Sequence, residues 1–113
     1  MKISLNGFGE AMATFEADSG VTAGMPVKMT GNGAVGACAA KDGFCGVAVS
    51  VRDGFAAVQL RGYAVLPYAG TTPAVGYQTL NAAGGGKVQV DGAGRSVLVT
   101  DVDTAAQICG IIL

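Results

Sequence analysis

The chain has 113 residues, of which 50% are hydrophobic and 13% charged, and its formal net charge is −1. This length fits one domain with one modest core. The basic residues are scattered singly, so the sequence lacks the basic face that nucleic-acid binding requires. Asn6-Gly7 interrupts the first apolar residues too early for a signal peptide, and no apolar run reaches the roughly 18 residues of a membrane helix. We therefore expect a protein that folds in a reducing cytoplasm and binds neither nucleic acid nor membrane.

The first half of the sequence consists of short apolar runs separated by turn residues. Residues 25–30 alternate between apolar and polar side chains, which predicts a strand. Gly31-Asn32-Gly33 indicates a hairpin turn to a returning strand over 34–40. After a second turn at Lys41-Asp42-Gly43, residues 44–51 form a β-prone run with valine at alternate positions.

Asp53-Gly54 is the strongest turn signal in the sequence. An Asp-Gly pair between two alternating apolar runs is typical of a tight hairpin. The turn should therefore join 44–51 to an antiparallel neighbour. We predict one long strand over 55–66, in which Gly62 marks either a bulge or a position where another backbone comes close.

The second half shows the same punctuation, with no convincing helix and no evident internal repeat. Its predicted elements are a loop at 67–73, a strand at 74–80, a flexible turn at 81–86, a strand at 87–91, a turn at 92–94, a strand at 96–101, a polar turn at 101–104 and a strand at 105–113. We therefore predict an all-β fold, a small single-domain β-barrel or sandwich of eight to ten short antiparallel strands. The expected core residues are Val47, Val49, Val58, Leu60, Val88, Val90, Val97 and Val99.

The residues that enzyme chemistry needs are missing or badly placed. The chain has no His, so a Ser or Cys nucleophile lacks its commonest base. Asp101 and Asp103 are expected to be solvated carboxylates of a polar turn rather than an acid–base pair. Gly84-Gly85-Gly86-Lys87 and Gly92-Ala-Gly94-Arg95 lack the spacing of a phosphate-binding loop and are expected at hairpin tips. We predict no catalytic residues and no cofactor.

Three cysteines, Cys38, Cys45 and Cys109, occur at irregular spacing. An odd number without a Cys-x-x-Cys pair argues against a disulfide framework, and the lack of His argues against zinc. Cys45 is in phase with the valines of 44–51, as expected of a thiol on an apolar strand face. We expect three free thiols and no bound metal.

Val27-Lys28-Met29 is similar to the Met-Lys-Met that carries biotin in small all-β carrier domains. The match covers two residues, lacks the flanking Ala, and places the lysine before a turn rather than at its tip. A prosthetic-group carrier is therefore a minor alternative.

Five stretches follow one another in a definite order: Val21-Thr-Ala-Gly-Met-Pro-Val27, Phe44-Cys-Gly-Val-Ala-Val49, Asp53-Gly54 leading to Val58-Gln-Leu-Arg-Gly62, Pro73-Ala-Val-Gly-Tyr77, and Ile108 to Leu113. In this order and spacing the chain resembles a family of small decoration, or cement, proteins of tailed-phage capsids. Gly and Val recur in these stretches, and the resemblance spans about residues 15–113.

The resemblance implies a barrel-like domain over 15–113 that sits on the virion surface after synthesis in the host cytoplasm. Its partner would be the major capsid protein, and it would form a homotrimer or another homo-oligomer. By position alone, residues 1–14 correspond to an N-terminal arm that contacts the shell. The expected capsid-binding residues of this arm are Lys2, Ile3, Leu5 and Phe8.

Two further interpretations remain open. One is another structural part of the virion, such as a tail or baseplate module. The other is a small ligand- or sugar-binding barrel, which predicts an exposed aromatic cluster built from Tyr63, Tyr68 and Tyr77.

Overall fold

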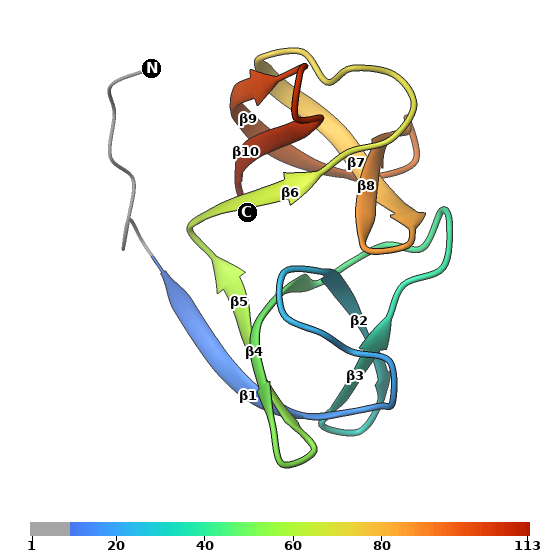
Figure 1. Cartoon of the computed structure of the whole chain (residues 1–113), viewed down its shortest axis with the longest axis vertical. Helices are drawn as coiled ribbons and strands as arrows, with labels where there is room; N and C mark the ends of the chain where they lie inside the picture. Colours follow the sequence, from blue (N-terminus) through green and yellow to red (C-terminus); the bar gives the residue numbers. More distant parts are fainter. Residues whose placement is uncertain (1–9) are drawn as a thin grey trace.

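The computed structural model describes residues 10–113, and every regular element in that range is a β-strand (Figure 1). The predicted all-β fold is confirmed. The strands are β1 (Ala11–Ala17), β2 (Pro26–Gly31), β3 (Ala34–Ala37), β4 (Gly46–Arg52), β5 (Phe55–Arg61), β6 (Tyr63–Pro67), β7 (Gly76–Gly84), β8 (Lys87–Val90), β9 (Arg95–Asp103) and β10 (Ile108–Ile112).

The first five strands form a closed barrel in the order β1-β3-β2-β4-β5. Most neighbours are antiparallel, and the Asp53-Gly54 turn joins β4 to β5 as predicted. Both turn residues have positive φ, 53° and 79°, as a tight hairpin requires. The barrel closes through a parallel pair, Ala17 of β1 beside Val35 of β3. A parallel pair was not expected from the sequence, because pairing between distant strands leaves no local turn signal.

The last five strands form a second sheet in the order β6-β10-β9-β7-β8, in the upper half of Figure 1. This sheet curls toward closure. Tyr68, the residue after β6, forms a parallel bridge with Val88 of β8. The Ala69 N–H then donates to the Val88 carbonyl at 2.9 Å. The two edges of the second sheet therefore meet at one point.

The second sheet repeats the connectivity of the barrel strand for strand. In both, the first strand pairs with the fifth, the fifth with the fourth, the fourth with the second, the second with the third, and the third returns in parallel to the first. The parallel closure matches to the residue: Ala17 with Val35 corresponds to Tyr68 with Val88. The hydrogen bond from Ala69 to Val88 likewise corresponds to one from Asp18 to Val35, also 2.9 Å.

The strand irregularities repeat as well. The β4–β5 pair shifts register around Val49, and the β9–β10 pair shifts at the corresponding place around Thr100. One difference between the halves remains: the register of β2 against β4 is shifted by two residues relative to the register of β7 against β9. The sequence hid this duplication because equivalent buried positions hold different apolar residues, such as Val58 in the barrel and Ile111 in the second sheet. The duplication is therefore evident in the structure although no repeat is evident in the sequence.

Two buried clusters fill the molecule, and one of them joins its halves. The barrel core holds Val21, Val27, Val35, Ala48, Ala56 and Val58. The core of the second sheet holds Leu66, Leu80, Val99 and Ile111 among others, and it also takes in Phe44 and Val47 from the barrel side. Because this core draws on both halves, the chain folds as one domain.

Most of the predicted core residues are buried: Val47, Val58, Val88, Val97 and Val99. Leu60 and Val90 are partly buried and pack against the two cores. The prediction that Val49 is a core residue is wrong, since its side chain is 48% exposed. It is the extra residue of the β4 bulge, and a bulge interrupts the alternation on which the prediction relied.

The predicted strand over 55–66 is in fact two strands that turn a corner at Gly62. Gly62 has φ 101° and lies between β5 of the barrel and β6 of the second sheet. The Gln59 amide holds this corner from inside by donating to the carbonyls of Arg61 at 3.1 Å and Tyr63 at 2.8 Å. Gly62 marks the crossing between the two sheets rather than a bulge. The alternative expectation, that another backbone comes close here, is met, since the Leu113 N–H donates to the Gly62 carbonyl at 3.0 Å.

Several predicted boundaries also need correction. The β7 strand runs through residues 81–84, which were expected to form a turn. The carboxylates of Asp101 and Asp103 lie on β9, and the turn follows them at 104–107. Residues 11–14, assigned to the arm, pair within the barrel as part of β1. In each case main-chain pairing with a neighbouring strand sets the bounds of the element.

Candidate functional site

The residues singled out for chemistry do not form a reaction centre. Within residues 10–113 the structure has no pocket, and no three metal-binding side chains come together. Asp101 accepts hydrogen bonds from the hydroxyls of Thr100 at 2.6 Å and Tyr63 at 3.2 Å. Asp103 accepts from the N–H groups of Ala105 and Ala106 and so shapes the turn after β9. Both carboxylates have structural hydrogen-bond partners.

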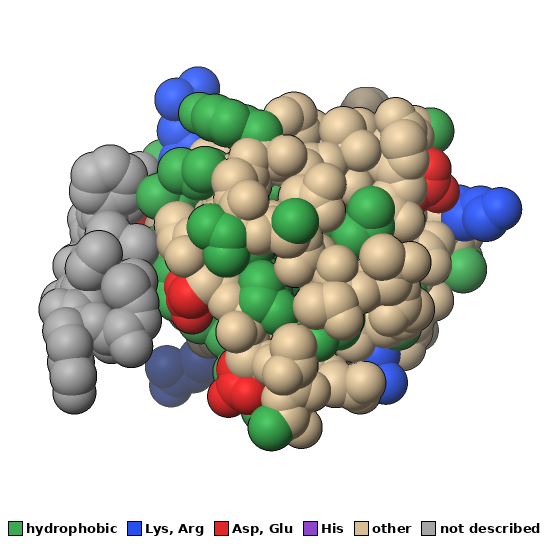
Figure 2. Space-filling view, turned by 90° about the horizontal axis from the view of Figure 1, so that it is seen from above, with side chains coloured by type: hydrophobic (Ala, Val, Ile, Leu, Met, Phe, Trp, Pro, Cys, Tyr) green, Lys and Arg blue, Asp and Glu red, His purple; other side chains and the backbone are tan. Residues whose placement is uncertain are grey.

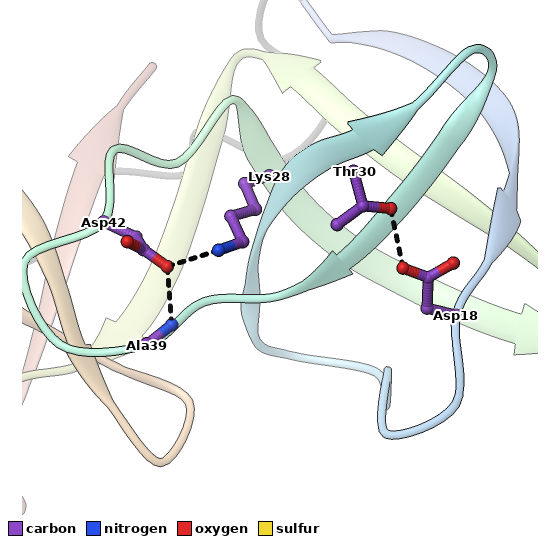
Figure 3. Close-up of polar contacts among 5 residues, drawn as sticks. All are labelled: Asp18, Lys28, Thr30, Ala39 and Asp42. Atoms are coloured by element: carbon purple, nitrogen blue, oxygen red, sulfur yellow. Dashed lines mark hydrogen bonds and ion pairs between the residues drawn. The ribbon is translucent and has the colours of Figure 1, made fainter.

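Lys28 of the carrier-like motif is tied into an ion pair (Figure 3). Its Nζ lies 2.6 Å from Oδ2 of Asp42, which also accepts the Ala39 N–H at 2.9 Å. The hydrogen bond with Asp42 raises the pKa of Lys28, and Lys28 lowers the pKa of Asp42. Lys28 lies within β2, and its ion pair with Asp42 anchors the loop between β3 and β4. A lysine that carries a prosthetic group must be free at a turn, so this placement does not fit the carrier alternative.

The first Gly-rich stretch lies at a hairpin tip, as predicted, whereas the second does not, because it joins β8 to β9, which are not paired with each other. Gly84 and Lys87 close the β7–β8 hairpin, and Gly84, Gly85 and Gly86 all have positive φ. Gly92 to Gly94 turns the chain from β8 into β9, where the Ala93 N–H donates to Asp91. Neither stretch precedes a helix, so neither matches a phosphate-binding loop.

The three cysteine thiols are free. Cys109 is buried in the core of the second sheet, whereas Cys38 and Cys45 are partly buried. Burial raises the pKa of Cys38 and of Cys109 to about 11 and also raises that of Cys45. A high pKa keeps a thiol protonated and therefore a poor nucleophile.

The three tyrosines do not gather into a sugar-binding platform. Tyr68 is buried in the core, with 3% of its surface exposed. Tyr77 is exposed on β7, and Tyr63 lies on β6 with its hydroxyl bound to Asp101. The exposed aromatic cluster that this alternative predicts is therefore not formed.

The most distinctive surface is the outer face of the second sheet, which we call the apolar face. Alternation along the strands points Ala64, Leu66, Cys109 and Ile111 into the core. The residues between them therefore point away from it. The apolar face consists of Tyr63, Val65 and Pro67 on β6, Ile108 and Ile112 on β10, Leu98 on β9 and Tyr77 on β7.

Strand register aligns four of these residues in one row. Tyr63 pairs with Ile112, Ile112 with Leu98, and Leu98 with Tyr77, so the row crosses four strands. Tyr77 is 77% exposed and Val65, in the next row, 47% exposed. Figure 2 looks onto the end of the molecule formed by the second sheet, where hydrophobic side chains are exposed with acidic ones beside them. An exposed sheet face is ordinarily polar, so this face has the composition of a binding surface.

Sequence reasoning missed this face, although the sequence held a signal for it. Residues 108–113 are apolar or Gly at every position, whereas a strand with one solvated face alternates. The predicted capsid-binding residues Lys2, Ile3, Leu5 and Phe8 lie outside the described residues.

Comparison of the sequence with protein-family models and with curated proteins finds no match. In the described part of the chain, no helix has the length and apolar character needed to span a membrane.

Proposed function

We propose that the protein is a capsid decoration protein: a non-enzymatic structural protein that binds the outside of a phage capsid and stabilises it. The observation that carries this proposal is the apolar face, on which Val65 and Tyr77 are exposed and the other residues half-buried, in a fold without a pocket in its described part. A flat apolar surface fits contact with another protein better than it fits a small ligand, which needs a concave site. The capsid is proposed as the partner because the order and spacing of the Gly- and Val-containing stretches resemble those of cement proteins.

The physical role of such a protein follows from mass action. A ligand that binds the assembled shell, and not the free major capsid protein, shifts the equilibrium toward the shell. Many copies on a symmetric lattice act together and add avidity. The arm offers a means of attachment: Lys2-Ile3-Ser4-Leu5 alternates polar and apolar residues, and such a segment can add as a strand to a sheet edge.

The test mixes the purified full-length chain with capsids assembled from the major capsid protein of the same genome. The chain should sediment with the shells at a saturable copy number and raise the temperature at which they disassemble. It should not bind unassembled major capsid protein. Failure to bind shells would refute the proposal, and binding confined to purified tails would support a tail or baseplate module.

A further inference from the structure

The hairpin between β2 and β3 ends in an exposed Asn-Gly pair. Gly31 of β2 pairs with Ala34 of β3, so Asn32 and Gly33 alone form the loop between them. Both loop residues are exposed, and nothing beyond its chain neighbours lies within 4 Å of the position that a Cβ would take on Gly33. Within residues 10–113, no hydrogen bond joins the Asn32 side chain to another group. The described fold therefore neither restrains this amide nor shields it from water.

An Asn followed by Gly can react within its own main chain in water. The Gly nitrogen, after losing its proton, attacks Cγ of the Asn side chain. The new N–Cγ bond closes a succinimide ring, and the Cγ–Nδ2 bond breaks to release ammonia. Water then opens the ring, either at Cγ to leave aspartate or at the main-chain carbonyl carbon to leave isoaspartate, so one water is consumed for each ammonia released. Gly favours ring closure because it has no side chain to crowd its nitrogen and its backbone is the least restricted.

The other asparagine in the described part of the chain is held in place. Asn81 is only 3% exposed, and its Oδ1 accepts a hydrogen bond from Gln89 at 3.2 Å. It lies within β7 and precedes Ala82 rather than a Gly. Its amide can turn toward the next nitrogen only when the strand opens locally. The structure thus distinguishes a free asparagine, Asn32, from a protected one.

The tip that carries Asn32 also helps to close the barrel. The Glu16 N–H of β1 donates to the Gly33 carbonyl at 2.9 Å. Thr30, the extra residue of the bulge just before the tip, donates its hydroxyl to Oδ2 of Asp18 at 2.6 Å (Figure 3). In the described chain, β1 and β3 are joined by only two residue pairs. The closure therefore depends on the length and position of this tip.

We propose that Asn32 is a site of spontaneous deamidation, and that its conversion to isoaspartate loosens the closure of the barrel. Isoaspartate adds one methylene to the main chain of a loop whose length sets the register of its strands. The Gly33 carbonyl is then displaced from the Glu16 N–H. Either product also adds a carboxylate to a closure that already holds Glu16 and Asp18, and like charges on paired strands destabilise the pair. The inference stands independently of the proposed function.

The first experiment incubates the folded full-length chain near pH 8 and follows its tryptic peptides by mass spectrometry. Tryptic cleavage places Asn32 in peptide 29–41 and Asn81 in peptide 62–87. Peptide 29–41 should exchange its amide for a carboxyl at least about tenfold faster than peptide 62–87, because Asn81 reacts only when its strand opens. Methylation by a protein isoaspartyl methyltransferase should identify isoaspartate in peptide 29–41. Equal rates for the two peptides, or a rate for Asn32 far below its rate in guanidinium chloride, would overturn the proposal.

The second experiment measures the thermal midpoint before and after the same incubation. The midpoint of the wild-type chain should fall as isoaspartate accumulates. Asn32→Gln is the matched control, because it keeps the exposed amide but closes a ring more slowly through its longer side chain. It also retains Asn6, so any conversion there affects both chains alike. Equal midpoints for the incubated wild type and the incubated Asn32→Gln chain would refute the loosened closure.

A third chain separates the added methylene from the added charge. Asn32→Asp, without incubation, carries the new carboxylate on a main chain of normal length. Its midpoint should fall less than that of the fully converted wild type. An equal fall would refute the role assigned to the added methylene.

Discussion

The guanidinium of Arg95 lies over the aromatic ring of Phe44, with its central carbon 5.5 Å from the ring centroid. Its Nη1 also donates to the carbonyls of Phe44 at 3.4 Å and Cys45 at 3.3 Å. Arg95 begins β9 of the second sheet, and Phe44 comes just before β4 of the barrel. One side chain thus links the two halves by both cation–π and hydrogen-bond contacts.

The first prediction follows from this contact. Arg95→Ala should lower the free energy of unfolding by about 1–3 kcal/mol, since it removes the cation–π contact and leaves the carbonyls without their donor. Urea denaturation monitored by circular dichroism measures the change. The exposed Lys87→Ala is the control and should stay within about 0.5 kcal/mol of the wild type. Equal midpoints for the two variants would show that the contact contributes nothing.

Two adjacent isoleucines separate the core of the second sheet from its apolar face. Ile111 is fully buried, and Ile112 points the other way and is partly exposed. Ile111→Ala should cost about 2–5 kcal/mol of stability, the usual range for a large buried side chain. Ile112→Ala should cost about 1 kcal/mol or less, because it removes less area from contact, but it should weaken association with capsids. Denaturation at low protein concentration measures the loss of stability, and sedimentation with capsids measures the loss of association. If Ile111→Ala and Ile112→Ala lost equal stability, the assignment of Ile111 to the core and Ile112 to the outer face would be contradicted.

The corner at Gly62 depends on a backbone conformation that other residues rarely adopt. Its φ of 101° lies where a side chain is strained. Gly62→Ala should therefore destabilise the chain by about 1–3 kcal/mol. Gly92→Ala is a matched control, because Gly92 has no positive φ and nothing near its missing side chain. A Gly62→Ala variant as stable as Gly92→Ala would mean that the corner relaxes freely.

The buried thiols give the protein a pH dependence on the alkaline side. Folding raises the pKa of Cys38 and Cys109 from an ordinary value of 9.0 to about 11. Their contribution to stability is complete below about pH 9 and is lost as the pH rises toward 11, because the unfolded chain ionises first. The raised pKa of Tyr63 acts in the same direction.

The thiol prediction has two measurements. Near pH 8 a thiol reagent should label the native chain far more slowly than the chain in urea, where all three cysteines react. Cys109→Ala should reduce the fall in the denaturation midpoint between pH 8 and pH 10. Alanine should fit there, since Ala56 occupies the equivalent buried position of the barrel. Native labelling as fast as denatured labelling would disprove thiol burial.

The sequence was most informative where local chemistry decides the structure. Asp53-Gly54 was predictable as a hairpin because Asp and Gly tolerate the positive φ that the turn requires. The inward phase of Val97 and Val99 followed from alternation, which holds wherever a strand is regular. The fold class followed from many such local signals.

The remaining features depend on contacts that no local pattern reports. The bulge that exposes Val49 interrupts alternation, and the turn at Gly62 sends a continuous apolar run into two sheets. The parallel closure of β1 on β3 joins strands that are distant in the sequence. The apolar face could be suspected from residues 108–113, but its row from Tyr63 to Tyr77 depends on strand order.

The last prediction concerns the segment before the barrel. Strand pairing in the described part of the chain begins with Ala11 opposite Arg61, so deletion of residues 2–7 leaves every described pair intact. We expect the truncated chain to keep the thermal midpoint of the full-length chain. Its occupancy on capsids should fall, because Ile3 and Leu5 supply the alternate apolar side chains of a strand that adds to the shell.

A full-length chain with Ile3→Asp and Leu5→Asp is the control for the deletion, because it retains the length of the segment and removes only its apolar side chains. Both variants should lose occupancy to a similar degree if the side chains make the attachment. Loss with the deletion alone would assign attachment to the main chain of the segment. Unfolding of the truncated chain would place residues 2–7 in the barrel instead. Undiminished binding by both variants would move the attachment surface to the body of the protein, where the 67–73 loop is the next segment to test.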